Sequence, residues 1–225
     1  MEWSWPFGSK HFLSMDISPL LDLEAIGKGF DSVPVDPFVK DGTRHKAIVR
    51  VCVQPNGISV GSHEPLYQSA KLNYGVYGAE LRPYREMSPE LLAHLEPALR
   101  VFACLTGVYG QELLVQAQRV VATSGTDGRT GQTVREGYHQ DGSNVIGMLV
   151  TGRVGIKGGI SLLSPTQQGE DLLFAKTLAE GELLIVNDRK VFHNATSIHA
   201  LKEGGHRDIV LIAAPSFRAP VSVAA

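Results

Sequence analysis

The second half of the chain, from about Glu112 onward, consists of short apolar runs separated by connectors that are rich in turn residues. The runs contain many Val, Ile and Leu residues and are bounded by Gly, Asp and Thr, which is typical of strands. They cover residues 113–122, 144–151, 159–163, 171–178, 182–186 and 207–214, with connectors such as 123–131 and 202–205 between them. Short strands at this regular spacing predict two sheets packed together as a jelly roll.

The first half of the chain is more mixed. Residues 47–53 read as a strand, with valines on one face and Arg50 on the other. A helix is expected to begin after Ser88, a suitable N-cap followed by a proline, and to end at Gly107. Its apolar residues recur at helical spacing: Leu91, Leu95, Leu99, Phe102 and Leu105. Pro97 predicts a kink or a break in this helix, and a shorter helix is expected over 18–27.

These elements predict a fold that is mainly β with flanking helices, in which the longer helix packs on the outside of the jelly roll. The chain has 225 residues, of which 43% are apolar, enough for one domain with a substantial core. We expect a single domain over 1–225. Residues 1–110 would supply supporting strands, a helix and a candidate lid, and residues 111–225 would form the jelly-roll core that carries the functional site.

Composition argues against several classes of partner. Lys and Arg total 21 against 23 Asp and Glu, a net charge of −2, so no excess of positive charge favours nucleic acid. The longest apolar runs, 145–150 and 209–214, are too short to span a membrane. The first residues show no signal-peptide pattern, and two cysteines are too few for a disulfide framework. We therefore expect a cytoplasmic protein that binds neither nucleic acid nor membranes.

The segment that precedes the strand at 144–151 contains His139 and Asp141. In an extended segment, residues two apart point to the same side, so this imidazole and this carboxylate can reach one small volume. Two histidines and one carboxylate form the facial triad that binds non-heme iron(II) and leaves positions open for substrate and oxygen. The pair therefore predicts a metal site that lacks one ligand.

The third ligand must come from a distant strand. His193 follows the buried run 182–186 by a short turn, and it lies 193 − 139 = 54 residues after His139. His199 and His206 flank the polar loop 202–205, where solvent exposure is expected. We favour His193 as the ligand over His199, and His206 is the remotest alternative.

Arg207 opens the last apolar strand, 14 residues after His193 (207 − 193 = 14). An arginine at this place points either to solvent or into a cavity, where it must be paired. A guanidinium group inside could bind a dicarboxylate through two parallel hydrogen bonds, a geometry that lysine does not reproduce.

This pattern resembles the iron(II)/2-oxoglutarate-dependent dioxygenases. The local sequences are similar to those of the bacterial free-amino-acid hydroxylases typified by L-isoleucine 4-dioxygenase. The likeness covers residues 113–215 most clearly and is carried by the segments 137–142, 152–153, 158–161, 188–193 and 205–208. One departure is Ile160, which stands where the group usually has an acidic residue after paired glycines.

The resemblance implies a double-stranded β-helix of the cupin-like jelly-roll type. It also implies that His139, Asp141 and His193 hold iron(II), and that Arg207 binds the distal carboxylate of 2-oxoglutarate. The reaction would consume O2, release succinate and CO2, and hydroxylate an unactivated carbon of a free, aliphatic L-amino acid, with ascorbate as an aid in vitro.

The substrate-binding residues are less constrained by the sequence. A free amino acid needs a cation for its carboxylate and acceptors for its ammonium group. The candidates are Arg153, Arg119, Arg82, Tyr74 and Glu136. Arg82 and Tyr74 belong to the loop 72–84, which is rich in Gly and Tyr and is the candidate lid. Trp3 and Trp5 are expected to form a packing or oligomer contact, so a homodimer is an alternative to a monomer.

Two further functions are compatible with a jelly roll. A cupin-like metal-dependent isomerase or epimerase would not use 2-oxoglutarate, and it would leave Arg207 without a ligand. A metal-free binding protein would carry His139 and Asp141 as ordinary surface residues. The carboxylate at Asp141 and the arginine at 207 favour the oxygenase over both.

Overall fold

The structure is a computed structural model, and it describes residues 3–68, 80–122 and 130–216. Its largest element is an 8-stranded sheet with the order β1-β13-β9-β16-β7-β2-β3 and with β6 paired to β2. The strands are β1 (Phe12–Asp16), β13 (Glu182–Asn187), β9 (Val145–Val154), β16 (His206–Ala214), β7 (Glu112–Val121), β2 (Arg44–Gln54), β3 (Gly57–Val60) and β6 (Arg85–Glu86). All pairs in this sheet are antiparallel except that of β2 with β6.

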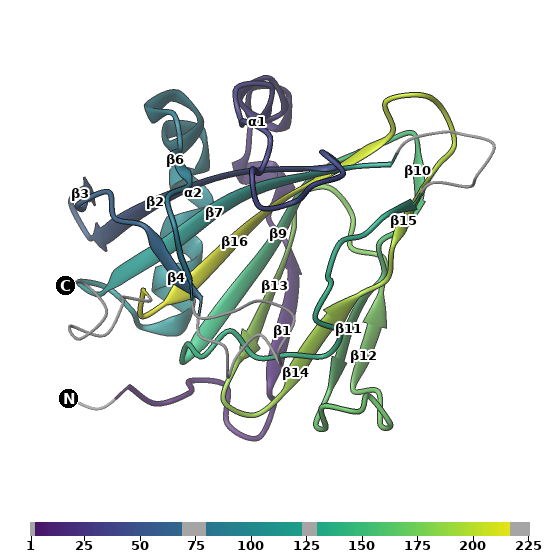
Figure 1. Cartoon of the computed structure of the whole chain (residues 1–225). Helices are drawn as coiled ribbons and strands as arrows, with labels where there is room; N and C mark the ends of the chain where they lie inside the picture. The colour runs from purple at the N-terminus through teal and green to yellow at the C-terminus, as the bar shows by residue number, and fades with distance from the viewer. Residues whose placement is uncertain (1–2, 69–79, 123–129, 217–225) are drawn as a thin grey trace.

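Three smaller sheets complete the β structure. The first has the order β12 (Phe174–Lys176), β11 (Ser161–Ser164) and β14 (Phe192–Ala195), and the second has the order β10 (Ile156–Gly158), β15 (Ile198–Ala200) and β8 (Thr130–Gly131). The third pairs β4 (Leu66–Gln68) with β5 (Glu80–Arg82). Figure 1 shows β11, β12 and β14 beside the large sheet, with β10 and β15 above them. Leu163 on β11 joins an apolar cluster with side chains of the large sheet, so the two layers share one interior.

The helices cover the other face of the large sheet. The structure has a short 3-10 helix (Ser18–Leu20) and two α-helices, α1 (Leu23–Phe30) and α2 (Pro89–Thr106). Their buried side chains form one cluster with outward-facing residues of β2, β7, β9, β13 and β16. None of the described helices combines the length and the hydropathy that a membrane span requires. The prediction of a mainly β fold with flanking helices around a jelly roll is confirmed.

Two details of the helices differ from the prediction. The segment expected to be one helix over 18–27 is divided, because Asp22 caps a new helix by accepting a hydrogen bond from the backbone N–H of Ala25 at 3.0 Å. The longer helix does not break at Pro97, although a proline removes one helical hydrogen bond. Leu91, Leu95 and Leu99 are fully buried against the sheet, and this packing holds the helix together across the proline.

Alternate side chains along the strands of the large sheet enter two different environments, one under the helices and one between the sheets. On β2, Ala47, Val49 and Val51 belong to the cluster under the helices, whereas Ile48 belongs to the cluster between the sheets. Successive side chains of a strand point to opposite faces, so Arg44 and Lys46 share the interior face with Ile48. The interior is therefore apolar in part and contains buried cations.

Candidate metal centre

His139 and His193 are brought together by the backbone. Residue 139 forms an isolated bridge with residue 193 on β14, and the two residues exchange N–H···O hydrogen bonds of 3.1 and 2.9 Å. As a result, the two imidazole rings lie with their centres 4.2 Å apart. One pair of main-chain hydrogen bonds thus holds together two residues that are 54 positions apart in the sequence.

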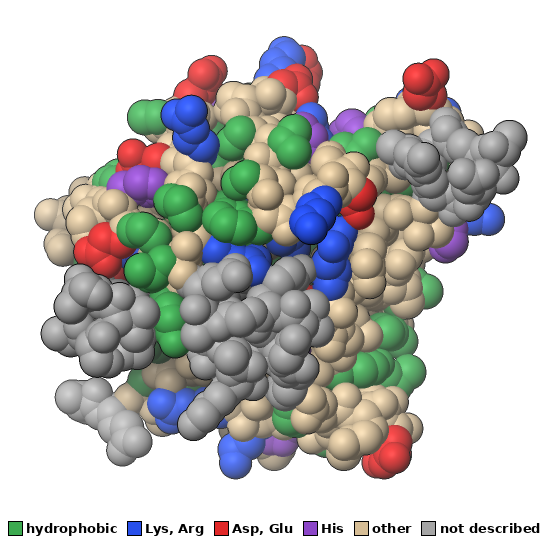
Figure 2. All heavy atoms as spheres, viewed as in Figure 1, with side chains coloured by type: hydrophobic (Ala, Val, Ile, Leu, Met, Phe, Trp, Pro, Cys, Tyr) green, Lys and Arg blue, Asp and Glu red, His purple; other side chains and the backbone are tan. Residues whose placement is uncertain are grey.

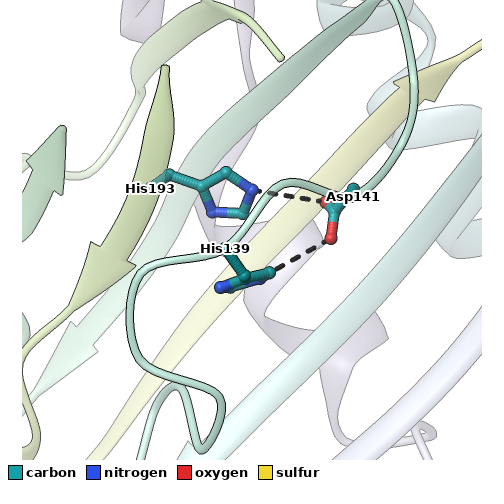
Figure 3. Close-up of side chains that lie close together, drawn as sticks. All are labelled: His139, Asp141 and His193. Atoms are coloured by element: carbon teal, nitrogen blue, oxygen red, sulfur yellow. Dashed lines mark ion pairs between the residues drawn. The ribbon is translucent and has the colours of Figure 1, made fainter. Parts of the chain in front are cut away.

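Asp141 completes a cluster of three ligands. Its two carboxylate oxygens lie 3.6 Å from His139 Nε2 and 3.7 Å from His193 Nε2. Figure 3 shows both rings turned towards this carboxylate. These distances are too long for direct hydrogen bonds, but one ligand atom from each residue lies within 4.8 Å of the others. A single ion placed among these atoms can contact all three.

The protonation of the two histidines also suits a metal. His139 Nδ1 lies 2.9 Å from the carbonyl oxygen of Gly137, so this nitrogen carries the proton and Nε2 offers its lone pair. His193 Nε2 is buried and has no hydrogen-bond partner among the described residues. Burial, and then the neighbouring His139, hold the pKa of His193 well below its usual value. Neutral imidazole is the form that binds metals, so the donor set fits a divalent metal of the iron type.

Asp188 holds the turn that carries Asp141. Its carboxylate accepts hydrogen bonds from the backbone N–H groups of Asp141, Gly142 and Ser143 at 3.1, 2.7 and 3.0 Å. Gly142 adopts a φ of 85°, a left-handed conformation that favours glycine and lets three successive N–H groups face one carboxylate. Burial, and then the charge of Asp141, raise the pKa of Asp188. Asp188 is therefore a positioning residue for the ligand.

Arg207 and Arg153 lie opposite each other on the neighbouring strands β16 and β9. Arg207 is 3% exposed, and its Nη2 lies 3.5 Å from Ser161 Oγ on β11, while Arg153 donates from Nη2 to the carbonyl of Gly158 at 2.7 Å. Arg207 Nε and Arg153 Nη1 are buried without a hydrogen-bond partner in the part of the chain that the structure describes. Burial and the charge of Arg153 lower the pKa of Arg207 to about 10, so Arg207 remains cationic at neutral pH. Two neighbouring guanidinium groups with unused donors favour the binding of an anion.

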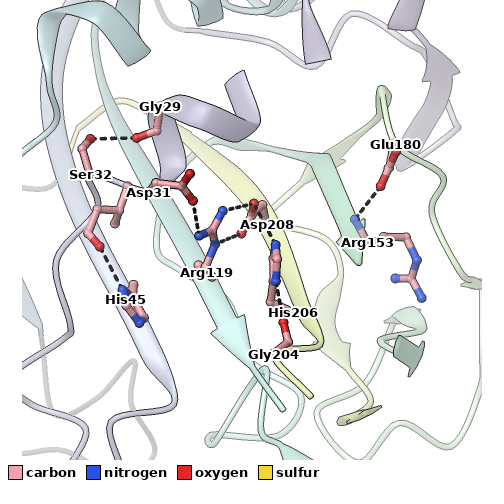
Figure 4. A network of polar contacts seen from close by, with 11 residues as sticks. Gly29, Asp31, Ser32, His45, Arg119, Arg153, Glu180, Gly204, His206 and Asp208 are labelled. Carbon is pink, nitrogen blue, oxygen red and sulfur yellow. Dashed lines mark hydrogen bonds and ion pairs between the residues drawn. The ribbon is translucent and has the colours of Figure 1, made fainter. Parts of the chain in front are cut away.

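Arg119 is placed differently. It lies on β7 opposite Asp208, on the helix side of the large sheet, where its guanidinium group is 5.8 Å from the Phe30 ring. Asp208 accepts two hydrogen bonds from it, at 2.7 and 2.8 Å, and Asp31 accepts a third at 2.8 Å. Figure 4 shows Arg119 between these two carboxylates, with the guanidinium group of Arg153 turned away from them. This placement does not support the prediction that Arg119 binds substrate.

The remaining candidates are scattered. Arg82 is 2% exposed, and its guanidinium group lies 4.9 Å from the Phe38 ring. Glu136 accepts a hydrogen bond from the backbone N–H of Arg135 at 3.0 Å, next to the metal-ligand segment. Tyr74 and most of the candidate lid lie outside the described residues. Substrate roles for these residues remain predictions.

The two alternative histidines lie outside the cluster. His199 is exposed on β15, opposite Thr130. His206 lies 3.8 Å from Asp208, close to the arginine network on the helix side. Among the described residues, the group that can hold a metal comprises His139, Asp141 and His193 alone.

Two buried polar residues of this region were not among the sequence candidates. Asp188 follows the apolar strand β13 and is 1% exposed, and an acidic residue at the end of a buried strand is a signal that could have identified it. Lys46 is 4% exposed on β2. The signal for Lys46 is the row of three cations on one face of the strand, Arg44, Lys46 and Arg50, interrupted by Ile48, while the other face is mainly apolar.

Known proteins resemble the chain both in sequence and in structure. The model of a family described as 2OG-Fe dioxygenase matches residues 27–213. Among solved structures, a bsmA homolog from Methylobium petroleophilum is similar, with a TM-score of 0.76 and 21% identity over 95% of this chain and 92% of that chain.

Two further solved structures are similar across most of their length. IDO from Bacillus thuringiensis has a TM-score of 0.69 and 15% identity over 92% of this chain and 93% of that chain. The Fe(II)/(alpha)ketoglutarate-dependent dioxygenase TqaL has a TM-score of 0.64 and 14% identity over 91% of this chain and 82% of that chain. At these identities the likeness supports the fold alone. No curated protein matches the chain.

Proposed function

Because the chain belongs to the 2OG-Fe dioxygenase family, we propose that it hydroxylates a free, aliphatic L-amino acid. Members of this family are oxygenases that use iron(II), 2-oxoglutarate and O2. The observation that carries the proposal is the cluster of His139, Asp141 and His193, whose ligand atoms lie together at the edge of a partly apolar, cation-bearing interior.

In this proposal, His139, Asp141 and His193 hold the iron. Iron bound to such a triad supplies the oxidation of 2-oxoglutarate to succinate and CO2, coupled to the insertion of one oxygen atom into a C–H bond. Asp188 keeps Asp141 in position through the three N–H groups that it binds.

Arg207 binds the distal carboxylate of 2-oxoglutarate, and Arg153 adds a second cation beside it. Support comes from the buried, unused N–H donors on both guanidinium groups and from their position opposite each other in the sheet. Ser161 on β11 lies within reach of Arg207 and orients it. Arg153 is therefore proposed to bind 2-oxoglutarate, whereas the sequence suggested that it binds the substrate.

The interior of the jelly roll orients the substrate and keeps water away from the reacting carbon. The apolar cluster between the sheets contains Met148 on β9, Ile209 on β16 and Leu163 on β11, with Leu211 packed against it. This apolar surface suits the aliphatic side chain of a substrate. The resemblance to free-amino-acid hydroxylases in the segments 137–142 and 188–193 supports the same substrate class. Membership of an oxygenase family weighs against a metal-free binding protein and against a metal-dependent isomerase or epimerase.

A turnover screen tests the proposal. The protein is given iron(II), ascorbate, 2-oxoglutarate and O2 with each common L-amino acid in turn, and succinate and oxygenated products are measured by mass spectrometry. Succinate formed together with an amino acid that has gained one oxygen atom supports the proposal and identifies the substrate. Succinate without any oxygenated amino acid contradicts the substrate class, and no succinate at all from iron-loaded protein contradicts the oxygenase assignment.

A further inference from the structure

Lys46 is a buried lysine on the interior face of β2. It is 4% exposed, and its Nζ lies 4.5 Å from the centre of the Tyr84 ring. Among the residues that the structure describes, no carboxylate or carbonyl accepts a hydrogen bond from this ammonium group. Lysine is almost never buried without a partner, because moving its charge out of water costs several kcal/mol. The position therefore requires an explanation beyond packing.

The other cations on the same face of β2 have partners within the chain. Arg44 forms an ion pair of 2.7 Å with Asp36, a carboxylate that is completely buried. Arg50 donates to the carbonyl oxygen of Glu64 at 2.8 Å and lies 3.8 Å from Glu112. Lys46, between these two arginines, is the member of the row that lacks such a partner among the described residues.

The charges around Lys46 come from four residues on different segments. Burial, followed by the positive charge of Arg44, lowers the pKa of Lys46 to about 7, and Arg82 acts in the same direction. The carboxylates of Asp36 and Asp141 oppose this shift. Since Asp141 belongs to the metal centre, the ammonium group of Lys46 lies close enough to that centre to be influenced by its charge. An additional anion at this place would stabilise the charged lysine.

Lys46 and Arg207 enter the interior from strands that are two positions apart. Lys46 is opposite Gln118 on β7, and Gln118 is opposite Ile209 on β16, two residues after Arg207. Neighbouring strands are about 4.8 Å apart, so the backbones at Lys46 and Ile209 are separated by about 10 Å across the sheet. Figure 2 shows Lys and Arg side chains gathered near the centre of the face that Figure 1 presents, over the large sheet. The interior thus offers two cationic positions, one on each side.

We propose that Lys46 binds the carboxylate of the substrate, while Arg207 and Arg153 serve the cosubstrate. The inference rests on the proposed function, and it defines the substrate class as a small molecule with a free carboxylate group. The Tyr84 ring, which is 2% exposed and packs edge-to-face against Phe38 at 5.3 Å, contacts the ammonium group of Lys46 and helps to position it. Amides and esters of the same molecules are poor ligands because they lack the anionic group that Lys46 requires.

Calorimetry under argon tests this with the full chain loaded with iron(II) and 2-oxoglutarate. The ligands are L-leucine, L-isoleucine, L-valine and L-methionine, each compared with its own carboxamide. The wild-type protein should bind at least one amino acid about 30-fold more tightly than the matching carboxamide, as expected for a charge-assisted hydrogen bond. In Lys46→Met this preference should disappear while the affinity for 2-oxoglutarate stays unchanged.

Lys28→Met is the matched control, because the side chain of Lys28 is 73% exposed on α1. It should behave as the wild-type protein in both titrations. A carboxylate preference that survives in Lys46→Met would overturn the inference. So would a loss of 2-oxoglutarate affinity in that variant, since it would place Lys46 at the cosubstrate.

A second measurement does not depend on turnover or on the variant folding. In wild-type protein labelled at the lysine side chains, NMR follows the titration of Lys46 with isovalerate and with isovaleramide, in the presence of saturating 2-oxoglutarate. Isovalerate should raise the pKa of Lys46 and isovaleramide should not. An unchanged titration with isovalerate would refute the role of Lys46, even where the turnover screen succeeds. A raised pKa together with a failed screen would refute only the proposed reaction.

Discussion

Arg119 and Arg207 lie on strands that pair directly, β7 and β16, but their surroundings are opposite. Arg119 points to the helix side, where Asp208 and Asp31 bind its guanidinium group at 2.7 and 2.8 Å. Arg207 points into the interior, where its hydrogen bond to Ser161 is 3.5 Å long and its Nε has no partner among the described residues. One face of the sheet therefore carries a paired arginine, and the other carries an arginine that is available to a ligand.

The difference between Arg119 and Arg207 indicates that one arginine stabilises the fold and the other serves ligand binding, although both lie in one sheet. A buried arginine bound by carboxylates of its own chain contributes to the folded state and has few donors left for a ligand. A buried arginine with unused donors destabilises the free protein and gains its anionic partner only when a ligand binds. The same reasoning distinguishes Lys46 from Arg44 on β2.

The largest effect is expected at the metal centre. His139→Ala removes one of the three ligands, so iron content and 2-oxoglutarate-dependent succinate formation should fall below detection. The fold should persist, because His139 belongs to no apolar cluster. His206→Ala is the matched control, because His206 lies beside the paired carboxylate Asp208 on the helix side. This variant should keep normal iron content and normal succinate formation. Metal analysis decides, and normal iron content in His139→Ala would contradict the site.

The two arginines should differ in their effect on stability. Arg119→Met leaves Asp208, which is 2% exposed, as a buried carboxylate without its main partner, and the free energy of unfolding should fall by about 3 kcal/mol. Arg207→Met removes a buried cation that has no acidic partner among the described residues, so stability should be unchanged or slightly higher. Urea unfolding of the metal-free variants measures both values. Equal losses in the two proteins would remove the distinction between the faces.

A smaller effect is expected at Asp188. Asp188→Asn keeps the size of the side chain but places an amide against backbone N–H groups that need an acceptor. Support of this kind typically changes metal affinity by 10- to 100-fold, so iron affinity should decrease within this range. Turnover at saturating iron should be affected less. Asp171→Asn, at an exposed aspartate, should leave both quantities unchanged, and an unaltered iron affinity in Asp188→Asn would argue against the positioning role.

The smallest effect at neutral pH concerns Lys46, and it grows as the pH rises. Its pKa is about 7 in the folded protein and close to 10.5 in the unfolded chain, so the unfolded chain binds more protons between these values. Stability of the wild-type protein should therefore rise with pH above 7, relative to Lys46→Met, with a slope that approaches about 1.4 kcal/mol per pH unit. Below pH 7 the difference should be constant, with the variant more stable. A difference that does not depend on pH between 7 and 9 would show that Lys46 is charged and paired in the free protein.

The spacing of short apolar runs was sufficient to predict the jelly roll, and the N-cap at Ser88 with apolar residues at helical spacing was sufficient to predict the helix that covers it. It could not predict that the helix continues through Pro97, because the stabilising contacts of Leu91, Leu95 and Leu99 come from distant strands. The pair His139 and Asp141 was visible because two residues at a spacing of two share one side of an extended segment. Choosing His193 over His199 required the surroundings of each histidine in the sequence, and the geometry agrees with that choice.

Roles that depend on long-range pairing could not be read from the sequence. Arg119 and Asp208 are separated by 89 residues, so a candidate ligand-binding arginine could not be distinguished from a structural one. Arg153 and Arg207 both begin or end strands, and only their register shows that they face each other. Lys46 could not be recognised as a candidate from the sequence, because the apolar residues on the other face of β2 are sufficient to predict the strand.

The most direct test of the account is the affinity for 2-oxoglutarate of the iron-loaded protein and of two matched variants, measured by calorimetry without oxygen. Arg207→Lys should bind 2-oxoglutarate about 10- to 100-fold more weakly than the wild-type protein, because a lysine cannot form the two parallel hydrogen bonds of a guanidinium group. Arg119→Lys should bind it with unchanged affinity. Equal affinities in the two variants would contradict the claim that the interior arginine, and not its paired neighbour, anchors the cosubstrate.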